Sequence, residues 1–114
     1  MENKRKLKRR FPIYYMKVYD RRSKQMVGRL VDITAEGMRL VSETPIEPGT
    51  VFNMRMDLPR PIENYSFLDF KAVSVWCDLD KNPDFFDTGY RILEGSPGSK
   101  EIIEGSFQGY LFQY

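Results

Sequence analysis

Residues 26–42, MVGRLVDITAEGMRLVS, decide how the rest of the chain is organised. Apolar and polar residues alternate in two runs, Met26–Val31 and Met38–Ser42, and this alternation predicts two β-strands. Between the runs lies the hexapeptide DITAEG, residues 32–37, whose composition is typical of a turn. The stretch therefore predicts two strands that reverse at a polar turn.

The side chains of this turn predict a polar binding site. Asp32 and Thr34 are short and can hydrogen-bond back to the turn, and Gly37 can take the positive φ that a sharp reversal requires. A carboxylate, a hydroxyl and several backbone N–H groups then lie close together, and they suit a polar ring or an anion better than an apolar ligand. An ordinary loop between strands is the alternative interpretation.

The same alternation predicts further strands on both sides of this stretch. We expect them at Ile13–Tyr19, Val51–Leu58, Tyr65–Trp76 and Thr88–Leu93, with turns at 20–25, 43–50, 59–64 and 77–87. In the longest strand the buried face is expected to hold Leu68, Phe70, Ala72 and Trp76. Stacking of Trp76 on a ligand is the alternative role for this side chain.

The C-terminal residues are expected to form a helix. Ser96-Pro97 is typical of a helix start, with proline at the first helical position. A single apolar stripe follows, made of Ile103, Phe107, Tyr110, Leu111 and Tyr114. Two glycines within the stripe each cost about 1 kcal/mol relative to alanine. We therefore expect this helix to depend on packing over the open end of the sheet.

These patterns together predict an all-β fold: a six-stranded antiparallel β-barrel with a C-terminal helix. The length of 114 residues suits one domain, and 41% apolar residues suit a globular chain. Short loops between many strands are typical of a small barrel. Closing the sheet also removes its exposed edges.

Charge is distributed unevenly along the chain. Residues 1–10 carry six basic side chains and one acid, so this segment is +5 and the remainder, with twelve basic and fifteen acidic residues, is −3. We expect residues 1–12 to form a flexible basic arm that binds an anionic partner, and residues 13–114 to form the barrel domain with its helix. A solubilising tail is the alternative for the arm.

The residue types exclude several classes of site. The chain has no histidine and one cysteine, Cys77, which excludes a Cys/His zinc site and an internal disulfide and removes the commonest general base. We expect neither catalysis nor a cofactor. A lone cysteine suits a reducing cytoplasm. We expect neither insertion into a membrane, because no apolar run reaches about 20 residues, nor a signal peptide.

Two motifs in this order resemble the PilZ domain family. The sequence RKLKR, residues 5–9, is similar to the Arg-x-x-x-Arg motif that family members carry before the first strand. The hexapeptide 32–37 is similar to the family motif Asp/Asn-x-Ser-x-x-Gly, with Thr34 in place of serine. Residues 37–40, 46–50 and 89–92 also look like the family pattern, so the resemblance extends from the arm to Leu93.

The resemblance implies a PilZ-type barrel that binds cyclic di-GMP, a bacterial second messenger. The ligand residues that it implies are Arg5, Arg9, Arg10, Asp32, Thr34 and Gly37. Arginine can fork onto a phosphate or onto the O6/N7 edge of guanine, and a carboxylate offers two acceptor oxygens to the guanine N–H donors. For the arm, Lys6 with Arg10 is the alternative register of the arginine motif.

Three functions remain open from the sequence. The leading one is a non-enzymatic sensor whose arm is ordered by cyclic di-GMP and which then signals to a downstream protein. The second is an adaptor of the same fold that has lost the nucleotide and acts through protein contacts. The third, a nucleic-acid binder, is disfavoured because the body is net acidic and its aromatic residues follow core-like alternation. Both a monomer and a homodimer are compatible with the sequence.

Overall fold

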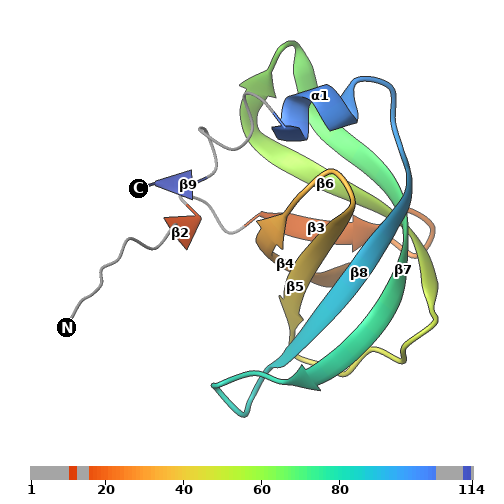
Figure 1. Cartoon of the computed structure of the whole chain (residues 1–114), viewed down its shortest axis with the longest axis vertical. Helices are drawn as coiled ribbons and strands as arrows, with labels where there is room; N and C mark the ends of the chain where they lie inside the picture. The colour runs from red at the N-terminus through yellow and green to blue at the C-terminus, as the bar shows by residue number, and fades with distance from the viewer. Residues whose placement is uncertain (1–10, 13–15, 105–111, 114) are drawn as a thin grey trace.

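The computed structural model of the chain describes residues 11–12, 16–104 and 112–113. Its elements are β2 (Phe11–Pro12), β3 (Lys17–Asp20), β4 (Met26–Ile33), β5 (Gly37–Ser42), β6 (Val51–Ile62), β7 (Tyr65–Leu79), β8 (Phe86–Gly95), α1 (Ser99–Glu104) and β9 (Phe112–Gln113). Strands β3 to β8 close into a barrel in the order β3-β4-β5-β8-β7-β6, with antiparallel neighbours. The predicted six-stranded antiparallel barrel is confirmed (Figure 1).

The interior of the barrel is filled by the alternating apolar residues that the sequence predicts. On β6, Met54, Met56 and Leu58 are buried, and on β7 Leu68, Phe70 and Ala72 face them. The methionines act as core filler here, because an unbranched thioether adapts to irregular gaps.

The hairpin between β6 and β7 is tighter than the loop predicted at residues 59–64. Strand β6 continues to Ile62, and only Glu63 and Asn64 form the turn, with φ of 50° and 71°. Two consecutive positive φ values are typical of a two-residue hairpin turn whose twist matches the strands. Pro59 and Pro61 are tolerated because the strand pairing is interrupted between Asp57 and Ile62, where no ladder hydrogen bond is required of them.

The C-terminal helix is shorter than predicted and begins later. It starts at Ser99 and not at Ser96-Pro97, because Gly98 has a φ of +83°, which is not helical. Ile102 and Ile103 on α1 are buried against the core, so the helix covers one end of the barrel as expected (Figure 1).

The predicted helical stripe is wrong at its far end. Phe112–Gln113 form strand β9, which pairs with β2 to one side of the barrel (Figure 1). Phe107, Tyr110, Leu111 and Tyr114 lie outside the described residues. The first barrel strand is also described only from Lys17, since residues 13–15 fall outside this range.

Trp76 does not share the buried face of β7, contrary to the prediction. The pairing of β7 with β8 shifts between Ser74, which is opposite Tyr90, and Trp76, which is opposite Gly89, so Val75 is an extra residue. Such a β-bulge interrupts the period of two. Beyond the bulge Cys77 takes the inward position, with Thr88 Oγ1 at 3.4 Å from its Sγ, and Trp76 is turned outward.

Candidate functional site

The turn between β4 and β5 is closed by hydrogen bonds from its own side chains. The Thr34 hydroxyl accepts the backbone N–H groups of Glu36 and Gly37, both at 3.2 Å. The Thr34 N–H donates to the Gly37 carbonyl at 2.8 Å, and the Ile92 N–H donates to the Glu36 carbonyl at 2.9 Å. The turn is therefore fixed both internally and against β8.

Asp32 stands on the outer face of the barrel beside this turn. Its Oδ1 accepts the Ile33 N–H at 2.9 Å, and the side chain is exposed. Within the described ranges no hydrogen bond or ion pair engages Oδ2. Among the residues that the structure describes, one carboxylate oxygen of Asp32 is thus unengaged.

Gly37 is required at its position for a different reason from the predicted one. The described glycines with positive φ are Gly49 and Gly98, so the prediction of a positive φ at Gly37 is wrong. A Cβ at Gly37 would instead lie 2.9 Å from the Tyr90 carbonyl oxygen. Gly37 therefore lets β5 and β8 approach closely, which holds the turn against the barrel wall.

A row of outward-facing positions crosses four neighbouring strands beside the turn. Asp32 is opposite Arg39 on β5, Arg39 is opposite Gly89 on β8, and Gly89 is opposite Trp76 on β7. Residues directly opposite one another in an antiparallel sheet project from the same face. We call Asp32, Arg39, Gly89 and Trp76 the outer row.

Two β-bulges bring the ends of the outer row onto one face. In β4 the pairing shifts between Leu30 and Asp32, so Val31 is an extra residue, as Val75 is in β7. Bulges often lie beside functional sites, where they re-aim a side chain. Here they direct Asp32 and Trp76 outward.

Trp76 packs against Gly89 on β8. It is 41% exposed, and a Cβ at Gly89 would clash with the indole ring. Glycine at position 89 therefore leaves room for the indole within the row. An exposed aromatic ring held in this way offers a flat surface for stacking a base.

Arg39 lies beside an acidic residue of the neighbouring strand, Asp87. Its Nη1 lies 3.6 Å from Asp87 Oδ2 on β8, and Asp78 on β7 is directly opposite Asp87. Burial raises the pKa of Asp87, with Asp80 and Asp78 adding to the rise and Arg39 opposing it. Asp87 Oδ1 is buried without a hydrogen-bond partner in the described part of the chain.

The structure brings together only part of the predicted site. Asp32, Thr34 and Gly37 lie on one turn, whereas Arg5, Arg9 and Arg10 lie outside the described residues. Sequence reasoning assigned no role to Arg39 and expected Trp76 in the core. The small residue Gly89 is consistent with a bulky side chain packed beside it. The β-bulge that places Trp76 opposite Gly89 cannot be predicted from the alternation of apolar and polar residues.

Other site types gain no support from the described residues. Among them, no group of three or more His, Cys, Asp or Glu side chains is placed to hold a metal ion. Nor does this part of the chain contain a helix of the length and apolarity needed to cross a membrane.

Comparisons with known proteins agree with the fold. A family model described as "PilZ domain" matches residues 3–109. No curated protein matches the chain. The chain is similar to the solved structure of the Bacillus subtilis inhibitor of motility, MotI/DgrA, with a TM-score of 0.63 and 14% sequence identity. The alignment covers 86% of this chain and 47% of that protein, so the chain spans about half its length. At this identity the similarity shows the fold alone.

Proposed function

Because the chain belongs to the PilZ domain family, we propose that it is a non-enzymatic cytoplasmic receptor for cyclic di-GMP in a bacterium. The observation that carries the proposal is the outer row, which presents an exposed carboxylate, a guanidinium and an indole side by side. These groups match a ligand made of two guanines and two phosphates.

Two groups of the row have distinct partners on such a ligand. Asp32 Oδ2 accepts N–H donors from the Watson–Crick edge of one guanine. Trp76 stacks under a base, because the indole is exposed and packs against Gly89. The Thr34 turn fixes the direction of Asp32 through its hydrogen bonds to Glu36 and Gly37.

The arm supplies the remaining charge in this proposal. Arg5 and Arg9, with Arg10 as an auxiliary, fork onto the phosphates or a guanine edge. Ordering the arm over the barrel costs conformational entropy, which lowers the affinity below what the contacts alone suggest. The ordered arm presents a changed surface, and we propose that a downstream protein binds it.

One observation favours a second candidate, an adaptor that does not bind the nucleotide. The Thr34 hydroxyl already accepts two N–H groups of its own turn, and its proton lies toward the Gly37 carbonyl at an oxygen–oxygen distance of 3.4 Å. The motif would then serve only to shape the turn, and the protein would act through protein contacts alone.

Calorimetry with cyclic di-GMP tests the proposal. The wild-type protein is expected to release heat, and Asp32→Ala or the double change Arg5→Gln/Arg9→Gln is expected to weaken binding at least about tenfold, about 1.4 kcal/mol. Asp84→Ala is the matched control, since Asp84 is an exposed carboxylate in the turn between β7 and β8, outside the outer row. Equal binding by Asp32→Ala and the control would contradict the site.

Thermal unfolding separates the two candidates. A ligand that binds only the folded state at 100 times its Kd stabilises it by about 2.7 kcal/mol. The receptor is therefore expected to show a higher Tm with cyclic di-GMP. An unchanged Tm at saturating nucleotide would favour the adaptor.

A further inference from the structure

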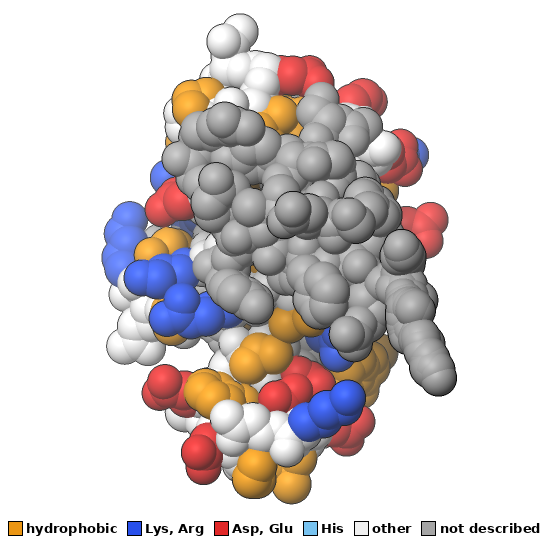
Figure 2. All heavy atoms as spheres, turned by 90° about the vertical axis from the view of Figure 1, so that its left-hand side faces the viewer, with side chains coloured by type: hydrophobic (Ala, Val, Ile, Leu, Met, Phe, Trp, Pro, Cys, Tyr) orange, Lys and Arg blue, Asp and Glu red, His pale blue; other side chains and the backbone are white. Residues whose placement is uncertain are grey.

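Two basic residues face each other directly on the outside of the barrel near the outer row. Lys17 on β3 is opposite Arg29 on β4, and both side chains are exposed. In the space-filling view, Lys and Arg side chains gather on one flank of the molecule, while Asp and Glu side chains are more widely scattered (Figure 2).

The Lys17–Arg29 pair differs from Arg39 and Arg55, which are both paired with carboxylates on neighbouring strands. Arg39 lies 3.6 Å from Asp87, and Arg55 donates to Asp69 at 2.8 and 3.1 Å. Within residues 16–104, neither Lys17 nor Arg29 has a carboxylate within ion-pair distance. Like charges directly opposite on a sheet are destabilising. The register of β3 with β6 continues to place the exposed Asp57 beside Lys17, which offsets part of this repulsion. No ion pair within residues 16–104 engages either cation, so both are open to an anionic partner.

The bulge at Val31 connects this basic pair to the outer row. Arg29 and Asp32 are three residues apart, so a regular strand would place them on opposite faces. With Val31 as an extra residue, both lie on the outer face of β4. Their Cα atoms are separated by about 10 Å at the usual strand rise. Arg29, with Lys17 beside it, is therefore within reach of a ligand that extends from Asp32 along β4.

We propose that Lys17 and Arg29 form a second anion subsite, which binds a phosphodiester group of the ligand seated on the outer row. This inference rests on the proposed function. The barrel itself thus contributes positive charge to the site, on β3 and on the β4 end of the row that runs through Val41 to Asp87. Arginine binds the phosphate through a fork and lysine through a point charge.

The subsite has a signature that a structural role would not produce. Removing the two charges relieves their mutual repulsion, so the ligand-free variant is expected to have an unchanged or higher Tm. The same variant is expected to bind the ligand more weakly. A residue pair that mattered only for folding would instead lower the Tm.

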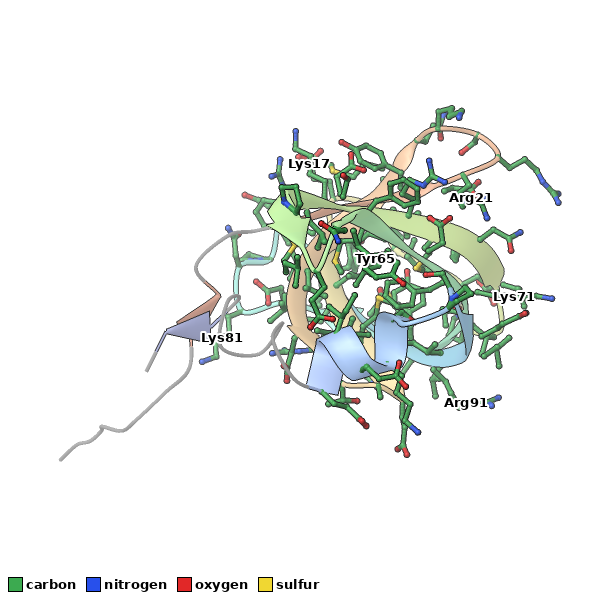
Figure 3. All side chains as sticks on the ribbon, turned by 90° about the horizontal axis from the view of Figure 1, so that it is seen from above. Lys17, Arg21, Tyr65, Lys71, Lys81 and Arg91 are labelled. Carbon is green, nitrogen blue, oxygen red and sulfur yellow. The ribbon has the colours of Figure 1, made fainter. Side chains whose placement is uncertain are left out.

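The test compares two double variants that lose the same number of charges. Lys17→Gln/Arg29→Gln removes the subsite, and Lys71→Gln/Arg22→Gln removes two exposed charges elsewhere. Lys17 and Lys71 lie well apart on the barrel (Figure 3). Calorimetry with cyclic di-GMP is expected to show a Kd about tenfold higher for the first variant and within about twofold of wild type for the second. The difference is expected to shrink at high ionic strength.

The outcomes separate this inference from the function on which it rests. If wild type binds cyclic di-GMP and both double variants bind it equally well, the subsite is refuted and the receptor function stands. If wild type does not bind, both proposals fall. The subsite would also be refuted if the ligand-free Lys17→Gln/Arg29→Gln variant had a lower Tm than wild type and its weaker binding were explained by that loss of stability. Lys17 and Arg29 would then stabilise the fold and not bind the ligand.

Discussion

At the scale of single residues, the same side chains shape the fold and the candidate site. Thr34 closes the turn through two backbone N–H groups, and Gly37 permits the close approach of β8. Gly89 leaves room for the Trp76 indole. Gly37 and Gly89 matter because they have no side chain, and Thr34 matters because its hydroxyl accepts hydrogen bonds. Substitutions there should therefore alter stability and ligand binding together.

Gly89→Ala is expected to displace Trp76, because the added methyl group would clash with the indole ring. Overpacking of this kind costs about 1–3 kcal/mol. Urea unfolding should show the loss, and the emission of Trp76, the one tryptophan of the chain, should shift.

A double variant controls for other effects of the methyl group. In the Trp76→Ala background, Gly89→Ala should cost much less than it does alone, because the clashing ring is gone. Additive costs in this cycle would show that the indole does not lie over Gly89.

Asp87→Asn is expected to stabilise the protein at neutral pH and not at acidic pH. The folded state raises the pKa of Asp87 above the ordinary value of 3.8, mainly through burial and then through Asp80. The fold therefore favours the protonated carboxyl, and the stability that this gives is lost as the pH rises through the raised pKa. At neutral pH the charged Asp87 opposes folding, and a neutral amide removes that effect.

The measurement is the difference in Tm between Asp87→Asn and wild type across the acid range. The advantage of the variant should shrink as the pH falls from 7 toward 3.8. Asp84→Asn, an exposed change in the same hairpin, serves as the control. A difference that does not vary with pH would contradict the role assigned to the Asp87 charge.

At the scale of elements, alternation in the sequence predicted the strands but not their irregularities. The core positions of β6 follow a strict period of two, so they could be read directly. The bulges at Val31 and Val75 could not be predicted from the sequence, because the position of a bulge depends on how the strand pairs with its neighbour. The Trp76 error follows from this. The end of the predicted helix failed because Phe112–Gln113 pair with Phe11–Pro12, a contact between the ends of the sequence.

Helix α1 is expected to contribute to stability through its buried isoleucines. Ile102 is 1% exposed in the core cluster, so Ile102→Ala should cost about 2–5 kcal/mol. Glu101→Ala on the exposed side of the same helix should change stability by less than about 0.5 kcal/mol. Urea midpoints of the two variants give the comparison, and equal midpoints would mean that α1 does not cover the core.

At the scale of the whole molecule, a closed barrel offers its outer wall to a ligand. The side that carries Asp32, Arg39 and Trp76 is built from β4, β5, β8 and β7. Strand β6 instead carries Arg55, which is paired with Asp69 and lies 3.8 Å from the centre of the Phe67 ring. The barrel wall is thus chemically different from side to side.

The sequence allowed half of the candidate site to be predicted. The Asp32–Gly37 turn is local, so its residues could be named from their spacing alone. Arg39 enters the site through the register of β4 with β5, and Trp76 through the registers of β5 with β8 and of β8 with β7, none of which the alternation pattern specifies. The arm arginines remain a prediction, because charge and motif alone support them.

The most direct test of the account is a titration of the protein with cyclic di-GMP, followed by two-dimensional NMR of the backbone amides and the single indole N–H. The account predicts the largest shifts at residues 32–37, at Arg39 and at the Trp76 indole, with new contacts to residues 5–10. Shifts confined to Arg55, Phe67 and Asp69, or an indole signal that does not move at saturation, would contradict it.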